Sequence, residues 1–132
     1  MKSQILLIDQ SIQRSAAIFP LLQQNDFRVL VANNISKSLQ HLVNTEFSLV
    51  IISASLDEEA MEFSKRIQKY ESKYTPVVLM NTELPEETLI AAQQCGISVC
   101  LDRRYYLESE SAFRRITTKL LQKANQASRA CA

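Results

Sequence analysis

Two polar residues that could do chemistry stand directly after short apolar runs. Asp9 follows the run at residues 5–8, and Ser53 follows the run at residues 49–52. Short continuous apolar runs are typical of strands that are buried on both faces of an open α/β sheet. In such sheets, ligands and reacting groups gather at the carboxyl ends of the strands. One strand end therefore offers a carboxylate, and the other offers only a hydroxyl.

A serine hydroxyl becomes a useful nucleophile only when a general base lies beside it. The chain has one histidine, His41, which stands on a helix face between Gln40 and Leu42. We therefore expect no Ser-His-Asp arrangement, no catalytic residues and no enzyme activity. A small hydrolase or transferase is the alternative, and loss of turnover in a Ser53→Ala variant would support it.

The elements that must position these residues alternate along the chain. Strands are predicted at residues 5–8, 28–32, 49–53, 76–80 and 99–101. Helices are predicted at residues 12–25, 57–73, 85–95 and 108–127, with one more that is capped at Asn34 or Ser36 and ends at residue 44. Such alternation with short connections predicts an α/β fold: a doubly wound parallel sheet with helices on both faces.

Several single residues refine these elements. Pro20 lies inside the first predicted helix and is expected to kink or break it. Val43 is expected to face inward, together with Leu39 and Leu42 of the same helix. Gly96 is well placed to end the fourth helix. The run at residues 103–106 is expected to be a loop.

Length and charge limit the class of protein. At 132 residues with a net charge of +1, the chain is predicted to be one domain at residues 1–125 with a flexible tail at 126–132. Nothing in the charge calls for nucleic acid or a membrane surface. The first apolar run is too short for a signal peptide or a membrane span, so a cytoplasmic location is expected.

The counts of glycine and cysteine exclude further classes of site. A single glycine rules out glycine-rich phosphate loops, both the dinucleotide fingerprint and the P-loop. The three cysteines, Cys95, Cys100 and Cys131, have no CxxC spacing and are expected to be reduced. No metal site is expected from them, because the one histidine is distant in the sequence.

The strand ends and the order of the five βα units resemble the receiver domain of bacterial response regulators. The resemblance covers nearly the whole chain and is carried by the segments ILLIDQS, FSLVIIS, TPVVLMNT and CGISVCLDRR. It implies a flavodoxin-like (βα)5 fold with strand order 2-1-3-4-5, and a role in two-component signal transduction. In that family the first strand ends in an acidic pair that holds Mg²⁺, and Asp9 matches the first member of the pair.

The other pocket positions depart from the family pattern. Gln10 replaces the second acidic residue, and Ser53 replaces the aspartate that accepts the phosphoryl group. Asn81 replaces the Thr/Ser switch residue, although Thr82 next to it could take that role. Arg103 replaces the lysine. Acceptance of a phosphoryl group needs a carboxylate nucleophile, a divalent cation and a lysine counter-charge. We therefore expect a vestigial pocket without metal or cofactor.

Loss of the cation site has local consequences. Arg103 is free to form an ion pair with Asp9, which we expect to replace the network of Mg²⁺, phosphate and lysine. Asp9 has a second interpretation, as an N-terminal cap of the first helix. Cys100 falls where the family often has a switching aromatic residue.

The resemblance implies a degenerate receiver that works as a phosphorylation-independent protein-interaction module. A protein partner or a second copy is expected to contact the face made by the fourth helix, fifth strand and fifth helix, with no direct contact to nucleic acid or membrane. The matching residues are Leu89, Gln93, Val99, Leu101, Tyr105, Tyr106, Phe113 and Ile116. Two alternatives are a receiver regulated by a small ligand or anion held by Arg103 and Asn81, and the N-terminal regulatory part of a longer response regulator.

Overall fold

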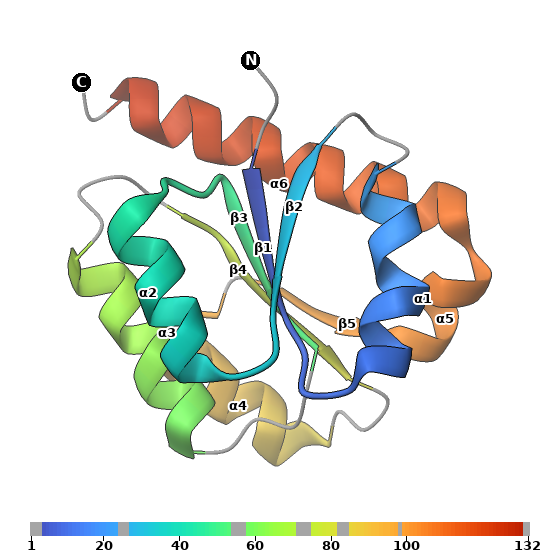
Figure 1. The fold of residues 1–132 in the computed structure, drawn as a ribbon, viewed down its shortest axis with the longest axis horizontal. Helices are drawn as coiled ribbons and strands as arrows, with labels where there is room; N and C mark the ends of the chain where they lie inside the picture. The colour runs from blue at the N-terminus through green and yellow to red at the C-terminus, as the bar shows by residue number, and fades with distance from the viewer. Residues whose placement is uncertain are drawn as a thin grey trace.

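The computed structural model describes residues 4–23, 27–53, 58–70, 75–81, 85–97 and 99–130 (Figure 1). The strands are β1 (Gln4–Ile8), β2 (Arg28–Ala32), β3 (Leu49–Ile52), β4 (Val77–Asn81) and β5 (Val99–Asp102). The helices are α1 (Ile12–Gln23), α2 (Ile35–Asn44), α3 (Glu58–Tyr70), α4 (Glu86–Gln94), α5 (Arg103–Glu108) and α6 (Glu110–Ala130).

The described strands form one parallel sheet in the order β2-β1-β3-β4-β5. The register pairs Ile8 with Ala32 of β2 on one side and with Ile52 of β3 on the other. Each of the strands β1 to β4 is followed by a helix that returns the chain to the start of the next parallel strand, as expected for right-handed crossovers. The predicted fold class and strand order are therefore confirmed.

Two apolar cores lie on the two faces of the sheet. Leu6 and Ile8 of β1 pack with Phe63 of α3 in the core beneath α2, α3 and α4. Ile5 and Leu7 of the same strand pack with Phe113 of α6 in the core beneath α1 and α6. Successive side chains of a strand point to opposite faces, so a continuous apolar run supplies both cores at once. The helices cover the sheet in the same two groups (Figure 1).

The end of α4 shows how local sequence stops a helix. Gly96 has a φ of 85°, a left-handed conformation that glycine adopts without steric cost. Its N–H donates to the carbonyl of Gln93, and the N–H of Ile97 donates to the carbonyl of Ala92. These two bonds form a Schellman motif, which satisfies carbonyls that the helix leaves unpaired. The predicted stop at Gly96 is confirmed.

The start of α2 is also set locally, although its inner face differs from the prediction. Asn34 is the N-cap, and its side chain accepts a hydrogen bond from the Lys37 N–H at 2.8 Å. Leu39 and Leu42 pack against the core as expected. Val43 does not, because its side chain is 84% exposed. The prediction that Val43 faces inward was wrong, since it lies on the solvent side of the last turn.

Three predicted boundaries differ from the observed ones. The run at residues 103–106 is not a loop but lies in α5, whose first turn is capped by Asp102. Pro20 does not end α1, which continues to Gln23 although proline lacks the N–H of an internal helical bond. Helix α6 begins at Glu110 and continues to Ala130, so both of its ends lie later in the chain than those of the helix predicted at residues 108–127.

Replacement of Gly96 by alanine should destabilise the fold, because a Cβ atom is disfavoured at a φ of 85°. We expect the free energy of unfolding to fall by about 1 kcal/mol in Gly96→Ala, as measured by urea denaturation. Gln94→Ala is the matched control, since Gln94 is exposed in the last turn of the same helix. Equal stabilities of the two variants would contradict the role given to Gly96.

Candidate functional site

The carboxyl ends of β1, β2 and β3 are joined by backbone hydrogen bonds beyond the strands themselves. The Asp9 N–H donates to the Ala32 carbonyl at 3.0 Å, and the Ser53 N–H donates to the Ile8 carbonyl at 2.9 Å. Because Ile8 is paired with Ile52, Asp9 and Ser53 are the next residues on neighbouring strands. The fold therefore places side by side the carboxylate and the hydroxyl that the sequence analysis singled out.

Asp9 is buried, with 1% of its surface exposed. Its Oδ1 atom accepts a hydrogen bond from the Ser11 N–H at 2.9 Å, immediately before α1 begins. The Ser11 carbonyl in turn accepts the N–H of Ser15 in the first turn of the helix. The Asp9 carboxylate thus orders the turn before α1 and does not cap the helix through this bond, because the Ser11 N–H lies outside the helix.

Ser53 is fully buried, with 0% of its surface exposed. Its hydroxyl has no histidine in position to activate it, because His41 lies in the last turn of α2. Helix α2 begins at the carboxyl edge of the sheet after β2 and runs back toward the opposite edge, so its last turn is far from the strand ends. This geometry gives no support to a Ser-His-Asp arrangement.

The ends of β4 and β5 continue the same edge of the sheet. Asn81 is half-buried and pairs in register with Asp102. The Asp102 Oδ1 atom accepts a hydrogen bond from the Arg104 N–H at 2.9 Å and lies 3.6 Å from the Arg104 Nε atom. Asp102 therefore caps α5, whereas Asp9 orders the turn before α1.

Two predicted pocket groups fall outside the described part of the molecule. They are Thr82 and the side chain of Arg103. The expected ion pair between Arg103 and Asp9 consequently stays a prediction. Gln10 is described, and its side chain is exposed to solvent beside the buried Asp9.

A cation site would need several oxygen, nitrogen or sulfur ligands within reach of one another. Among the described residues there is no group of three or more His, Cys, Asp and Glu side chains that could hold a metal ion. Asp9 and Asp102 each use one carboxylate oxygen to accept a backbone N–H. The described strand ends thus carry carboxylates that are engaged in starting helices.

The predicted interaction face divides into exposed and buried residues. Leu101 is 3% exposed and Phe113 is 0% exposed, and both pack in the core beneath α1 and α6. A partner cannot reach these two side chains, so their inclusion in the face was wrong. The physical reason is that Leu101 points from β5 into this core, and that Phe113 lies on the side of α6 that packs against the sheet.

The remaining residues of that face differ in accessibility. Leu89, Gln93 and Tyr105 are exposed, and Val99 and Ile116 are half-buried at the edge of the core. The side chain of Tyr106 lies outside the described part. Next to Val99, Cys100 is half-buried, and desolvation by burial raises the pKa of its thiol above the ordinary value. This thiol is therefore protonated at neutral pH.

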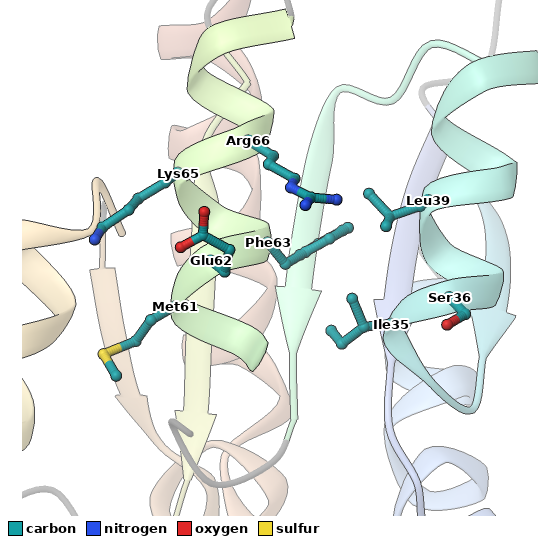
Figure 2. A pocket seen from close by; sticks show the side chains of 8 residues that line it. All are labelled: Ile35, Ser36, Leu39, Met61, Glu62, Phe63, Lys65 and Arg66. Atoms are coloured by element: carbon teal, nitrogen blue, oxygen red, sulfur yellow. The ribbon is translucent and has the colours of Figure 1, made fainter. Parts of the chain in front are cut away.

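The structure also reveals a groove that the sequence analysis missed. A groove of about 610 Å³ lies between α2 and α3 (Figure 2). Its apolar members include Ile35 and Leu39, spaced four residues apart on α2, and Phe63 on α3. The four-residue spacing was visible in the sequence, but it predicted only a buried helix face. Which part of that face stays open depends on the distance between the two helices.

Comparison with other proteins supports the fold. No family model and no curated protein matches the chain. A signal receiver domain of an HD domain-containing protein from Pseudomonas fluorescens matches with a TM-score of 0.83 and 20% identity, over 95% of this chain and 90% of that one. A response regulator from Thermotoga maritima matches with a TM-score of 0.82 and 17% identity, over 92% and 99%.

A third solved structure, an orphan response regulator of H. pylori, matches with a TM-score of 0.75 and 22% identity, over 89% of this chain and 96% of that one. The structural neighbours are thus response regulator receiver domains, and this chain has their fold. In addition, none of the described helices combines the length and the apolar character needed to cross a membrane.

Asp9 and Asp102, which each accept the N–H two residues later, provide a matched pair for measuring the role of Asp9. We expect Asp9→Ala to lower the free energy of unfolding by about 1–2 kcal/mol, because the Ser11 N–H loses its acceptor in a buried place. Asp102→Ala should cost about 0.5 kcal/mol, because the Asp102 side chain is 44% exposed and water can replace it. Urea denaturation measures both, and equal losses would contradict the local role of Asp9.

The corrected interaction face makes a second prediction about stability. Phe113→Ala should lower the free energy of unfolding by about 3–5 kcal/mol, because it leaves a cavity in a core where Phe113 is 0% exposed. Tyr105→Ala should change it by less than about 0.5 kcal/mol, because Tyr105 is 57% exposed. Thermal and urea unfolding of the two variants would show whether Phe113 is a core residue or a surface residue.

Proposed function

We propose that this chain is a receiver-type module of two-component signal transduction that acts through protein contacts and without phosphorylation. The receiver fold of its structural neighbours supports the general role. The finer part of the proposal depends on the chemistry of the strand ends, since fold alone does not specify activity.

The observation that carries the proposal is Ser53. It occupies the end of β3, where the receiver family resemblance places the aspartate that accepts the phosphoryl group. Its surface is 0% exposed and its N–H is bonded to the Ile8 carbonyl, so the hydroxyl is enclosed at a fixed backbone position. The side chain of Ser53 carries no carboxylate of its own, and no histidine lies beside it, so it is a poorer nucleophile toward a phosphohistidine than the aspartate of the family pattern.

The environment of Asp9 also supports the proposal. Mg²⁺ in phosphoryl-transfer sites is usually held by one or two carboxylates together with waters and phosphate oxygens. Here Gln10 supplies a neutral amide in place of a second carboxylate, and Asp9 Oδ1 accepts the Ser11 N–H. The replacement at Gln10 removes one negative charge from the place where a divalent cation would have to bind, and one oxygen of the remaining Asp9 carboxylate already accepts a backbone N–H.

The surface offers the groups for a protein contact. Leu89 and Tyr105 are 41% and 57% exposed, and Gln93 is exposed on the same helix as Leu89. Val99 and Ile116 add apolar area at the margin of the core. Exposed aromatic and aliphatic side chains are common anchors of protein interfaces. We propose that a protein partner or a second copy of the chain contacts this surface, called the α4–β5–α5 surface, which also includes Ile116 of α6.

The test is to add beryllofluoride and Mg²⁺ and to record backbone amide NMR spectra and sedimentation. Beryllofluoride mimics a phosphoryl group when it bonds to a carboxylate at the acceptor position, and Ser53 has none. We therefore expect unchanged amide shifts at the strand ends and an unchanged oligomeric state. The Ser53→Asp, Gln10→Asp double variant serves as the comparison, because it restores both missing carboxylates and should respond to the same additions.

Specific shifts of the Ser53 and Asn81 amides in the unmodified chain would overturn the proposal. Shifts that require Mg²⁺ and beryllofluoride together would indicate a working phosphoryl site. Shifts produced by an anion without Mg²⁺ would instead favour the ligand-regulated receiver, in which the altered pocket binds a small anion.

A further inference from the structure

The groove between α2 and α3 is separate from the strand-end site and from the α4–β5–α5 surface. It is lined by the first half of α2 and the middle of α3 (Figure 2). Helix α2 packs against β1 and β2, whereas the α4–β5–α5 surface lies at the other edge of the sheet. The proposed signalling role therefore leaves this groove unexplained.

The floor of the groove is apolar and is fixed by the fold. Phe63 is 1% exposed and belongs to the core beneath α2, α3 and α4. Ile35 and Leu39 are partly buried against the same core and point from α2 toward α3 (Figure 2). Because these side chains are held by core packing, the groove exists before any partner binds. A preformed apolar floor lowers the entropic cost of binding.

The apolar row continues along α2 beyond the groove. Val43 follows Leu39 by four residues, as Leu39 follows Ile35, so the three side chains lie in successive turns on neighbouring parts of the helix surface. Val43 is 84% exposed, and so contributes almost nothing to the core. Valine is also a weaker helix former than alanine or lysine. The fold gives no reason for valine here, whereas a partner lying along α2 does.

The lining of the groove carries two cations. Arg66 extends from α3 toward α2 over the apolar floor, while Lys65 extends from the other side of α3, away from α2 (Figure 2). Both side chains are exposed, and neither has an ion-pair partner among the residues described. Glu62 is the one carboxylate among the lining residues. The groove thus presents an excess of positive charge, and the planar guanidinium of Arg66 suits a carboxylate.

We propose that this groove binds an acidic amphipathic helix of a protein partner. The apolar row from Ile35 to Val43 is about 12 Å long at 1.5 Å per residue. Two turns of a partner helix present apolar side chains at i, i+3, i+4 and i+7 over a similar length. A carboxylate beside that apolar face would meet Arg66, which reaches over the floor of the groove (Figure 2). The inference goes beyond the proposed function, because it assigns a second contact surface with its own chemistry.

Two synthetic 18-residue helical peptides test the proposal. Both carry the same leucines at i, i+3, i+4 and i+7, and they differ in having glutamate or lysine at the flanking positions. Binding to the full chain is followed by fluorescence anisotropy at low salt and mapped by amide NMR shifts. We expect the glutamate peptide to bind about tenfold more tightly, as charge-assisted hydrogen bonds to arginine imply, with shifts confined to α2 and α3.

Variants on the two sides of the groove provide the controls. Arg66→Glu should reverse the preference between the peptides, and Val43→Ser should weaken the glutamate peptide about fivefold to tenfold through lost apolar burial. Both residues are exposed, so the melting temperature should stay unchanged. Lys119→Glu on α6 and Ile90→Ser on α4 are the matched exposed controls, and they should leave peptide binding as it is.

Several results would overturn the proposal. Equal binding of the two peptides, or a Val43→Ser variant that binds like the unmodified chain, would remove the groove as a recognition site. Shifts centred on α4–β5–α5 would assign the helix to the other surface. Self-association that is lost in Val43→Ser would show that a second copy, not an acidic helix, covers the groove. None of these results depends on how the chain responds to beryllofluoride.

Discussion

The central strands of this protein are buried on both faces, and the rest of the molecule depends on that constraint. Side chains of β1 alternate between the two cores, so Leu6 and Ile8 pack on one side while Ile5 and Leu7 pack on the other. A polar side chain in the middle of such a strand would be buried without water and costly. Polar residues are therefore confined to the strand ends, and the parallel register gathers those ends along one edge of the sheet.

At that edge the structure uses its carboxylates for local purposes. Asp9 and Asp102 each accept the backbone N–H two residues later; Asp102 thereby caps α5, whereas Asp9 orders the turn before α1. Ser53 lies between them in the sheet as a buried hydroxyl. Along the described edge, the carboxylates of Asp9 and Asp102 thus accept backbone N–H groups, and the hydroxyl of Ser53 is buried. The hydrogen bonds of the two aspartates stabilise the starts of α1 and α5. The proposed function depends on these contacts and on the buried hydroxyl of Ser53.

Two surfaces of the molecule expose apolar side chains above the same cores. Helices α2 and α3 meet the sheet through Leu39 and Phe63, but their outer parts leave an apolar groove below Arg66. At the other edge of the sheet, Leu89 and Tyr105 are exposed although Leu101 and Phe113 close to them are buried. Each surface depends on the same cores, because the residues beneath it hold the exposed side chains in place.

Sequence alone was enough for the fold class, the strand order implied by the family resemblance, and the polar strand ends, because apolar runs and helix signals act over a few residues. Gly96 and Asn34 were readable for the same reason, since a glycine stop and a side-chain cap form within one turn. The inward or outward position of Val43, Leu101 and Phe113 needed the folded chain. Exposure depends on how far one helix lies from the next and on which face a strand end turns to the core. Those distances are set by packing between segments remote in sequence, and no short pattern records them.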